Sequence, residues 1–276
     1  MNRYLLLSLL LLVGGCSVRQ AAIERLADAV AGGGDSYAMD DDAELVRAAA
    51  PFSLKLTESL LAETPRHRGL LAAAARGFTQ YAYAFVQQEA DELEERDVAA
   101  SIALQERARR LYRRARDYGL RGLAIAPDDA ELLYWTSAAW ASFIALSKND
   151  PDALADLPVV ERMIDRALEL DEAYERGAIH TFLVSYEMVR QDAKGDPAER
   201  ARAHFARAIE LSSGREAAPY VALAESVCIP AQRRAEFEEL LERALRADAP
   251  ESRLANLVMQ RRARWLRART DRLFND

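Results

Sequence analysis

A small residue recurs at the same place in four helical segments of the chain. Gly122, Ala167, Ala208 and Ala244 each follow apolar residues at helical spacing, and each precedes a turn by a few positions. This spacing predicts amphipathic helices, and a small side chain lets a second helix approach closely. From residue 41 onward alanine is abundant and runs of β-branched residues are missing, so we expect an all-α fold without a sheet.

The distances between these small residues indicate a repeat of helix pairs. They are 45, 41 and 36 positions, slightly longer than the roughly 34 residues of a tetratricopeptide repeat (TPR), and an insertion such as 147–158 absorbs the excess. Neither helix of a pair can bury its apolar face alone, so stacked pairs form an array with a concave binding surface. The sequence therefore predicts a TPR-like helical repeat array. The repeats are degenerate, because most of the consensus aromatic and glycine residues are absent. An ordinary helical bundle is the alternative.

Three acidic segments predict helix starts. Residues 41–45 and 128–132 share the sequence Asp-Asp-Ala-Glu-Leu, and residues 196–199 read Asp-Pro-Ala-Glu. An aspartate before a helix accepts hydrogen bonds from free backbone N–H groups, and proline is favoured at the first helical position. We therefore interpret these acidic residues as helix caps and not as ligands of a cation.

The first sixteen residues predict export and lipid attachment. Arg3 precedes the apolar run 5–13, which is shorter than the roughly 20 residues that cross a bilayer and is typical of a signal peptide. Residues 13–16, Val-Gly-Gly-Cys, resemble the lipobox of bacterial lipoproteins. The resemblance implies cleavage before Cys16, diacylglycerol on its sulfur, and acylation of the new amino group by a fatty acid such as palmitate. Several acyl chains anchor a protein firmly, and Ser17 favours the outer membrane over the inner one. A secreted protein with an incidental Cys16 is the alternative.

These features divide the chain into three parts. Residues 1–15 are the expected lipoprotein signal peptide, residues 16–40 the lipid anchor and linker, and residues 41–276 one TPR-like helical domain. No later segment approaches 18 uninterrupted apolar residues, so we expect a membrane attachment through the lipid alone.

The composition and motifs argue against catalysis. A formal charge of −7 disfavours nucleic acid as a partner. His67, His180 and His204 lack a second metal ligand at motif spacing, and no phosphate-binding loop or nucleophile elbow occurs. We expect no enzyme activity, no cofactor and no metal, with Cys228 as a buried apolar side chain. We also expect a cluster of basic residues near the C-terminus to form the solvated face of a docked helix: Arg261, Arg262, Arg264, Arg267, Arg269 and Arg272.

One segment, residues 69–91, mixes aromatic and amide side chains on a helical pattern. On a regular helix, Phe78, Tyr81 and Phe85 share one face, and Tyr83 and Gln87 lie on another. Such an aromatic stripe is most often part of a core. The interleaved amides and hydroxyls favour a second interpretation, in which these five residues line a cavity or pore that binds an apolar ligand through a few polar contacts.

The same part of the chain resembles a known family. Residues 51–55 (Pro-Phe-Ser-Leu-Lys), 58–63 (Glu-Ser-Leu-Leu-Ala-Glu) and 77–87 are similar to the T-components associated with TRAP transporters. The similarity runs from about residue 40 to the end of the chain. It implies a periplasm-facing lipoprotein with cryptic TPR-like repeats, which assembles as a homotrimer with a pore through each protomer and pairs with the solute-binding P-component.

For this chain, the resemblance implies an accessory role in passing a small ligand, for example an apolar carboxylate, to or from the P-component. The alternative is a TPR-like lipoprotein scaffold that supports cell-envelope assembly through protein–protein interaction. A periplasmic hydrolase is a third and weaker hypothesis, because it needs a carboxylate or histidine poised beside a partner in a pocket.

Overall fold

The computed structural model describes residues 19–190 and 193–275. The expected signal peptide and Cys16 lie outside these ranges. Within them every regular element is a helix and no strand occurs, which confirms the all-α fold class. None of the helices in the described ranges is both long and apolar enough to traverse a bilayer.

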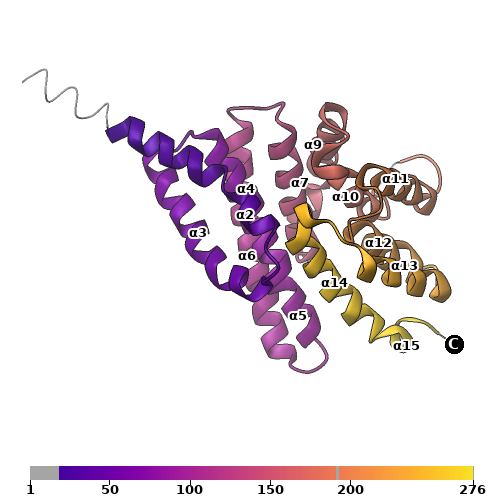
Figure 1. Cartoon of the computed structure of the whole chain (residues 1–276). Helices are drawn as coiled ribbons and strands as arrows, with labels where there is room; N and C mark the ends of the chain where they lie inside the picture. The colour runs from indigo at the N-terminus through magenta and orange to yellow at the C-terminus, as the bar shows by residue number, and fades with distance from the viewer. Residues whose placement is uncertain (1–18, 191–192, 276) are drawn as a thin grey trace, which may run out of the picture.

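The N-terminal half is built on long helices (Figure 1). Residues 19–31 are helical and pack on α3 and α4 through Ile23, Ala27 and Val30. Helix α6 packs along α4, α5 and α7, and α7 packs on α9. The elements of this half are α2 (Gly34–Ala38), α3 (Ala43–Glu63), α4 (Arg68–Tyr81), η1 (Ala82–Gln87), α5 (Gln88–Leu93), α6 (Val98–Leu123), α7 (Ala130–Ala145), α8 (Pro151–Ala155) and α9 (Leu157–Leu170).

The C-terminal half has shorter helices, and its last long helix returns to the first half. Its elements are η2 (Tyr174–Arg176), α10 (Ala178–Tyr186), α11 (Pro197–Ser212), α12 (Ala218–Leu223), η3 (Ala224–Cys228), α13 (Arg234–Arg246), η4 (Pro250–Ser252), α14 (Arg253–Arg267) and α15 (Thr270–Leu273). Helix α14, yellow in Figure 1, contacts α12 and α13 of its own half and α2 and α3 of the other. It therefore joins the two halves.

The helix starts predicted from aspartate are confirmed. Asp42 accepts hydrogen bonds from the N–H groups of Glu44 and Leu45 at the start of α3. Asp129 caps α7 in the same way through Leu132, and Asp196 caps α11. Each carboxylate satisfies backbone donors that have no partner within the helix.

Small residues occupy the places where helices approach most closely. A Cβ atom at Gly122 of α6 would come within 2.5 Å of the Leu132 side chain of α7, and one at Gly119 would lie 2.9 Å from Thr136 Cβ. Ala167, Ala208 and Ala244 are fully buried. This agrees with the physical reason given for the recurring small residue, while the stacking of the pairs as TPR-like repeats stays a prediction.

Candidate functional site

The helix that carries the five candidate lining residues is not a regular α-helix. Between α4 and α5, residues Ala82–Gln87 form the π-helix η1, in which the N–H of Gln88 donates to the carbonyl of Tyr83 five positions earlier. A π-helix inserts an extra residue into the turn, and such segments occur frequently at functional sites. The two helical faces predicted for residues 69–91 assumed regular spacing, so this local geometry corrects that assumption.

The aromatic members of the set pack in different directions. Phe78 is buried and stacks on Tyr118 of α6, with ring centroids 5.9 Å apart. Phe85 is buried beside Val46 of α3, and its ring lies 5.6 Å from that of Tyr81. Solvent reaches Tyr81 in part. Phe78 and Phe85 are thus core residues, as the more ordinary interpretation of the stripe expected.

Tyr83 and Gln87 make polar contacts inside the molecule. The Tyr83 hydroxyl donates to the Met259 sulfur of α14 over 3.6 Å, and the Tyr112 hydroxyl donates to Gln87 Oε1 over 2.6 Å. The structure does not bring all five predicted residues to one surface. Their role in lining a pore stays a prediction, and Tyr83 is the member that meets the C-terminal half.

Tyr83 lies beside a group of charged residues whose proximity the sequence did not predict. The Arg262 guanidinium of α14 donates to Asp91 Oδ2 of α5 over 2.6 Å and to Glu225 Oε1 of η3 over 2.7 Å. The exposed fractions of the three side chains are only 15% for Arg262, 22% for Asp91 and 27% for Glu225. We call Tyr83, Gln88, Asp91, Glu225 and Arg262 the central cluster. Arg262 was expected on a solvated face, and that expectation is wrong because two acids hold it inside.

Gln88 brings an unpartnered acceptor to the central cluster. Its side chain is 1% exposed, and its Nε2 donates to the Val258 carbonyl of α14 over 3.3 Å. No residue in the described part of the chain donates to its Oε1 atom. A buried amide oxygen without a donor is costly, and such an atom in a native fold calls for a water or a ligand.

The pKa values of the central cluster reflect partial burial of its side chains. Burial raises the pKa of Tyr83 to about 12. Burial also raises the pKa of Asp91, against the opposing effect of Arg262. For Arg262, burial disfavours the charged form, but Glu225, Tyr83 and Asp91 together outweigh burial, and the pKa of Arg262 is raised. Tyr83, Asp91 and Arg262 are nevertheless partly accessible. Charges on partly buried side chains interact more strongly than charges on exposed ones, because water screens them less.

A second π-helix supplies one of the two acids. Glu225 lies in η3, where the N–H of Ile229 donates to the carbonyl of Ala224. Both π-helices therefore contribute to the same cluster, η1 through Tyr83 and η3 through Glu225. Sequence reasoning missed Gln88, Asp91 and Glu225, because a carboxylate or an amide on a charged helix is usually a solvent-facing residue and its neighbours in sequence give no contrary signal.

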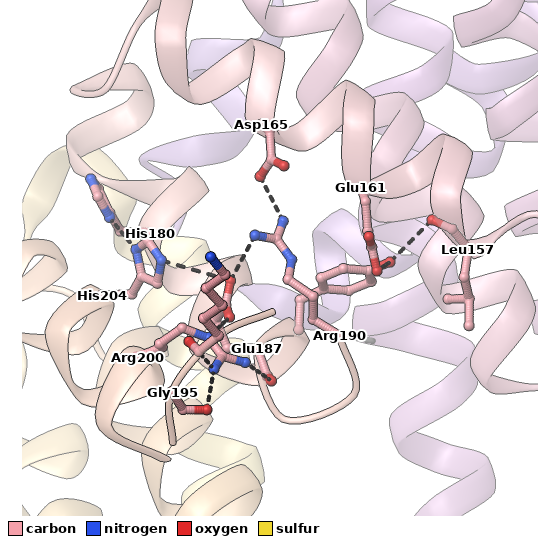
Figure 2. A network of polar contacts seen from close by, with 11 residues as sticks. Leu157, Glu161, Asp165, His180, Glu187, Arg190, Gly195, Arg200 and His204 are labelled. Carbon is pink, nitrogen blue, oxygen red and sulfur yellow. Dashed lines mark hydrogen bonds and ion pairs between the residues drawn. The ribbon is translucent and has the colours of Figure 1, made fainter. Parts of the chain in front are cut away.

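A second polar network lies among α9, α10 and α11 in the C-terminal part of the chain (Figure 2). Glu187, which is 1% exposed, accepts hydrogen bonds from Arg200 over 2.5 Å and pairs with Arg190 at 3.0 Å. Beside it, the Nδ1 atoms of His180 and His204 lie 2.8 Å apart. In the described ranges no group of three or more histidine, cysteine or acidic residues could hold a metal ion. Ion pairs and the contact between the two histidines therefore connect α9, α10 and α11.

Comparison with known proteins found a matching family model and a similar protein. The family model described as TRAP transporter T-component matches residues 39–130 and again residues 124–274. An uncharacterized protein of Treponema pallidum (strain Nichols) is 29% identical, and the alignment covers 96% of this chain and 95% of that protein. The two matches to the family model together take in nearly all of the described helices. The chain belongs to the TRAP transporter T-component family.

Proposed function

We propose that this TRAP transport component is a periplasm-facing lipoprotein that binds the solute-binding P-component and passes a small ligand along a path through its interior. Membership of the T-component family is the observation that carries this proposal. The family is one of transport components, so the central cluster is interpreted as a place where a ligand is held and released and not as a catalytic centre.

The position of the central cluster supports an interior path. It lies where η1 and α5 of the first half meet η3 and α14 of the second, and the side chains of its three charged members are only partly exposed. Tyr81, Tyr83 and Gln87, which solvent reaches in part, are the strongest of the proposed lining residues. The buried rings of Phe78 and Phe85 would support the wall from behind.

The mode of attachment forms the other part of the proposal. Cleavage before Cys16 and acylation of that residue would hold the helical body at the periplasmic face of a bacterial membrane, with the outer membrane favoured. Mass spectrometry of the protein purified from its native host tests this directly. A diacylglyceryl-modified N-terminal Cys16 is expected, and an unmodified thiol at that position would reject the anchor.

Capture of the P-component is the decisive test of function. The mature chain with Cys16→Ser, which has no acyl group, is mixed with the TRAP solute-binding protein of the same host and examined by size exclusion with light scattering. We expect a stable complex, and a trimeric mass for the T-component alone. A solute-binding protein from an unrelated transporter class serves as the control. A monomer that captures neither protein would reject the proposal and favour the scaffold alternative.

A further inference from the structure

The helix at residues 19–31 is fixed to the body of the protein. Its Ala27 is fully buried, and Ile23 packs beside it against the core of α3 and α4. At the start of this helix, Arg19 pairs with Glu63, the last residue of α3, at 3.1 Å. The position of Arg19 relative to the rest of the molecule is therefore set by packing.

The proposed lipid anchor lies close to this helix along the chain. Only residues 17 and 18 separate Cys16 from Arg19. An extended chain spans at most about 3.6 Å per residue, so the steps from Cys16 to Arg19 cover about 11 Å at most. With acyl chains on Cys16, the start of the helix is therefore held next to the surface of the bilayer.

Three segments meet at this end of the molecule, which we call the anchor end: residues 19–22, 62–67 and 120–125. The pair of Arg19 and Glu63 joins the first segment to the second. Arg121 of α6 donates to the Pro65 carbonyl over 3.1 Å, which joins the second segment to the third. In Figure 1 the indigo start of the described chain lies at one extremity of the molecule, away from α13 and α15.

The anchor end is basic although the chain as a whole is acidic. Its segments contain three arginines and one glutamate, a formal charge of +2, whereas the whole chain carries −7. Arg66 is exposed, and in the described part of the chain neither Arg66 nor Arg121 pairs with a carboxylate. Leu120 and Ile125 add apolar side chains that are 38% and 36% exposed. Unpaired arginines beside exposed apolar groups fit the headgroup region of an anionic membrane.

We infer that the anchor end lies on the headgroups of a bilayer that contains anionic phospholipid, with Arg66 and Arg121 at the lipid phosphates. The inference rests on the proposed function, because it takes Cys16 as the point of attachment, and it adds the surface that faces the membrane.

This contact orients the whole body. Helices α3, α4 and α6 each have an end at the anchor end, so they lead away from the membrane. Helix α6 has 26 residues, which is roughly 39 Å of helix. Its far end adjoins α5, which carries Asp91 of the central cluster. That side of the protein then faces the periplasm, where the P-component approaches.

Chemical modification of arginine in the membrane-coupled protein tests the inference. The mature chain, which begins at Cys16, is coupled through the Cys16 thiol to a maleimide lipid in vesicles of phosphatidylcholine, with or without phosphatidylglycerol. Cys228 is fully buried and does not compete for the maleimide. A water-soluble glyoxal then modifies the exposed arginines, and mass spectrometry measures the rate at each of them.

On vesicles with phosphatidylglycerol, Arg66 and Arg121 should react at least roughly fivefold more slowly than in the chain capped with N-ethylmaleimide, a factor that corresponds to about 1 kcal/mol for one basic residue at an anionic surface. Arg246 on α13, which is 70% exposed, is the internal reference and should keep its rate. Salt at about 1 M should remove the protection, because it shortens the screening length to about 3 Å. Unchanged rates, equal protection without phosphatidylglycerol, or equal protection of Arg246 would overturn the inference.

Charge variants assign the contact to the anchor end. Arg66→Gln removes an exposed, unpaired charge, so the protection of Arg121 should fall toward its value on vesicles without phosphatidylglycerol. Arg246→Gln makes the same change of charge on α13 and should leave the protection of Arg121 unchanged. Equal effects of the two substitutions would show a general attraction and overturn the inference.

The outcome of this test is separate from that of the proposed function. The maleimide lipid replaces the natural acyl groups, so the result does not depend on acylation of Cys16 by the host. Absence of protection would overturn this inference alone. An unmodified Cys16 in protein from the host would reject the proposed attachment, and failure to capture the solute-binding protein would reject the proposed function.

Discussion

At the scale of single residues, the contact between His180 and His204 depends on the protonation of the two rings. Their Nδ1 atoms lie 2.8 Å apart, so one must donate and the other accept, and the contact holds one proton between the rings. His180 Nε2 lies 3.3 Å from Glu172 Oε1, and His204 Nε2 lies 4.0 Å from Glu187 Oε1. A second proton at the contact would place two N–H groups face to face.

This pair predicts a loss of stability in mild acid. Burial lowers the pKa of both imidazoles from 6.5, with nearby Glu172 and Glu187 opposing and Arg207 and Arg190 reinforcing the effect. The unfolded chain therefore takes up protons first as the pH falls below 6.5, and the free energy of unfolding decreases until the folded-state pKa values are reached. Well above pH 6.5 both rings are neutral in both states, so the pair adds no pH dependence there.

Urea unfolding at a series of pH values measures this effect. The variant with His180→Gln and His204→Gln is the comparison, because glutamine retains hydrogen-bonding groups and does not titrate. Its stability should vary less between neutral and mildly acidic pH than that of the unsubstituted chain. The same slope in both proteins would show that other groups cause the acid sensitivity.

At the scale of elements, the contact between α6 and α7 depends on two glycines. Gly119 and Gly122 lie one turn apart on α6 and face Thr136 and Leu132 of α7. Glycine lowers the intrinsic stability of a helix by about 1 kcal/mol relative to alanine. Its presence at both positions shows that the close approach of the helices matters more than the propensity of either residue.

Gly119→Ala is expected to destabilise the protein by about 1–3 kcal/mol, the range for overpacking a close contact, despite the gain in helix propensity. The new Cβ would lie 2.9 Å from Thr136 Cβ, which is held on the α7 backbone and cannot move away easily. Gly33→Ala, where the nearest atoms lie at an ordinary 3.5 Å, is the control. Thermal unfolding of both variants tests the contact, and a Gly119→Ala protein as stable as the control would contradict it.

At the scale of the whole molecule, α14 and the segment after it fasten the C-terminal half to the N-terminal half. Arg261 pairs with Glu92 at 2.7 Å, and Arg262 bridges Asp91 and Glu225. Arg269 pairs with Glu95 at 2.8 Å. Residues about 170 positions apart in the chain thus meet across the interior, and the basic C-terminal segment finds its acidic partner within the same molecule.

Arg262→Met should open this connection. Removing the cation leaves Asp91 and Glu225 together in a desolvated place, and breaking a buried ion pair costs about 3–5 kcal/mol. Because the three side chains are still partly accessible, we expect a value at or below the lower end of that range. Hydrogen exchange should increase in α5 and α14 before it increases elsewhere.

The matched control is Arg243→Met on α13. Arg243 and its partner Glu239 have side chains that are 52% and 61% exposed, and such surface pairs contribute about 0–1 kcal/mol. Urea unfolding compares the two variants. Similar stabilities would mean that the ion pairs of α14 do not hold the halves together.

The features that the sequence predicted correctly depend on interactions within one helix or between neighbouring helices. Periodic apolar residues, aspartate caps such as Asp42 and Asp129, and the small residues that include Gly122 act within one helix or between neighbouring helices, so they predicted the all-α fold and its close contacts. The order of motifs along the chain also indicated the family. Of the five candidate lining residues, the buried pair Phe78 and Phe85 followed the ordinary packing interpretation of such a stripe.

The residues of the central cluster come together only in the tertiary structure, so the sequence alone did not predict the cluster. Asp91 and Arg262 are 171 positions apart, and η3 brings Glu225 to them from a third place in the chain. The π-helix at Ala82–Gln87 departs from the regular helical spacing, and it packs against α6 and, through the Tyr83 hydroxyl, contacts Met259 of α14. Hydrophobic periodicity records which face of a helix is buried, but it carries no information about which distant charge lies opposite. That pairing depends on how the halves close on each other, and it determines the chemistry of the interior.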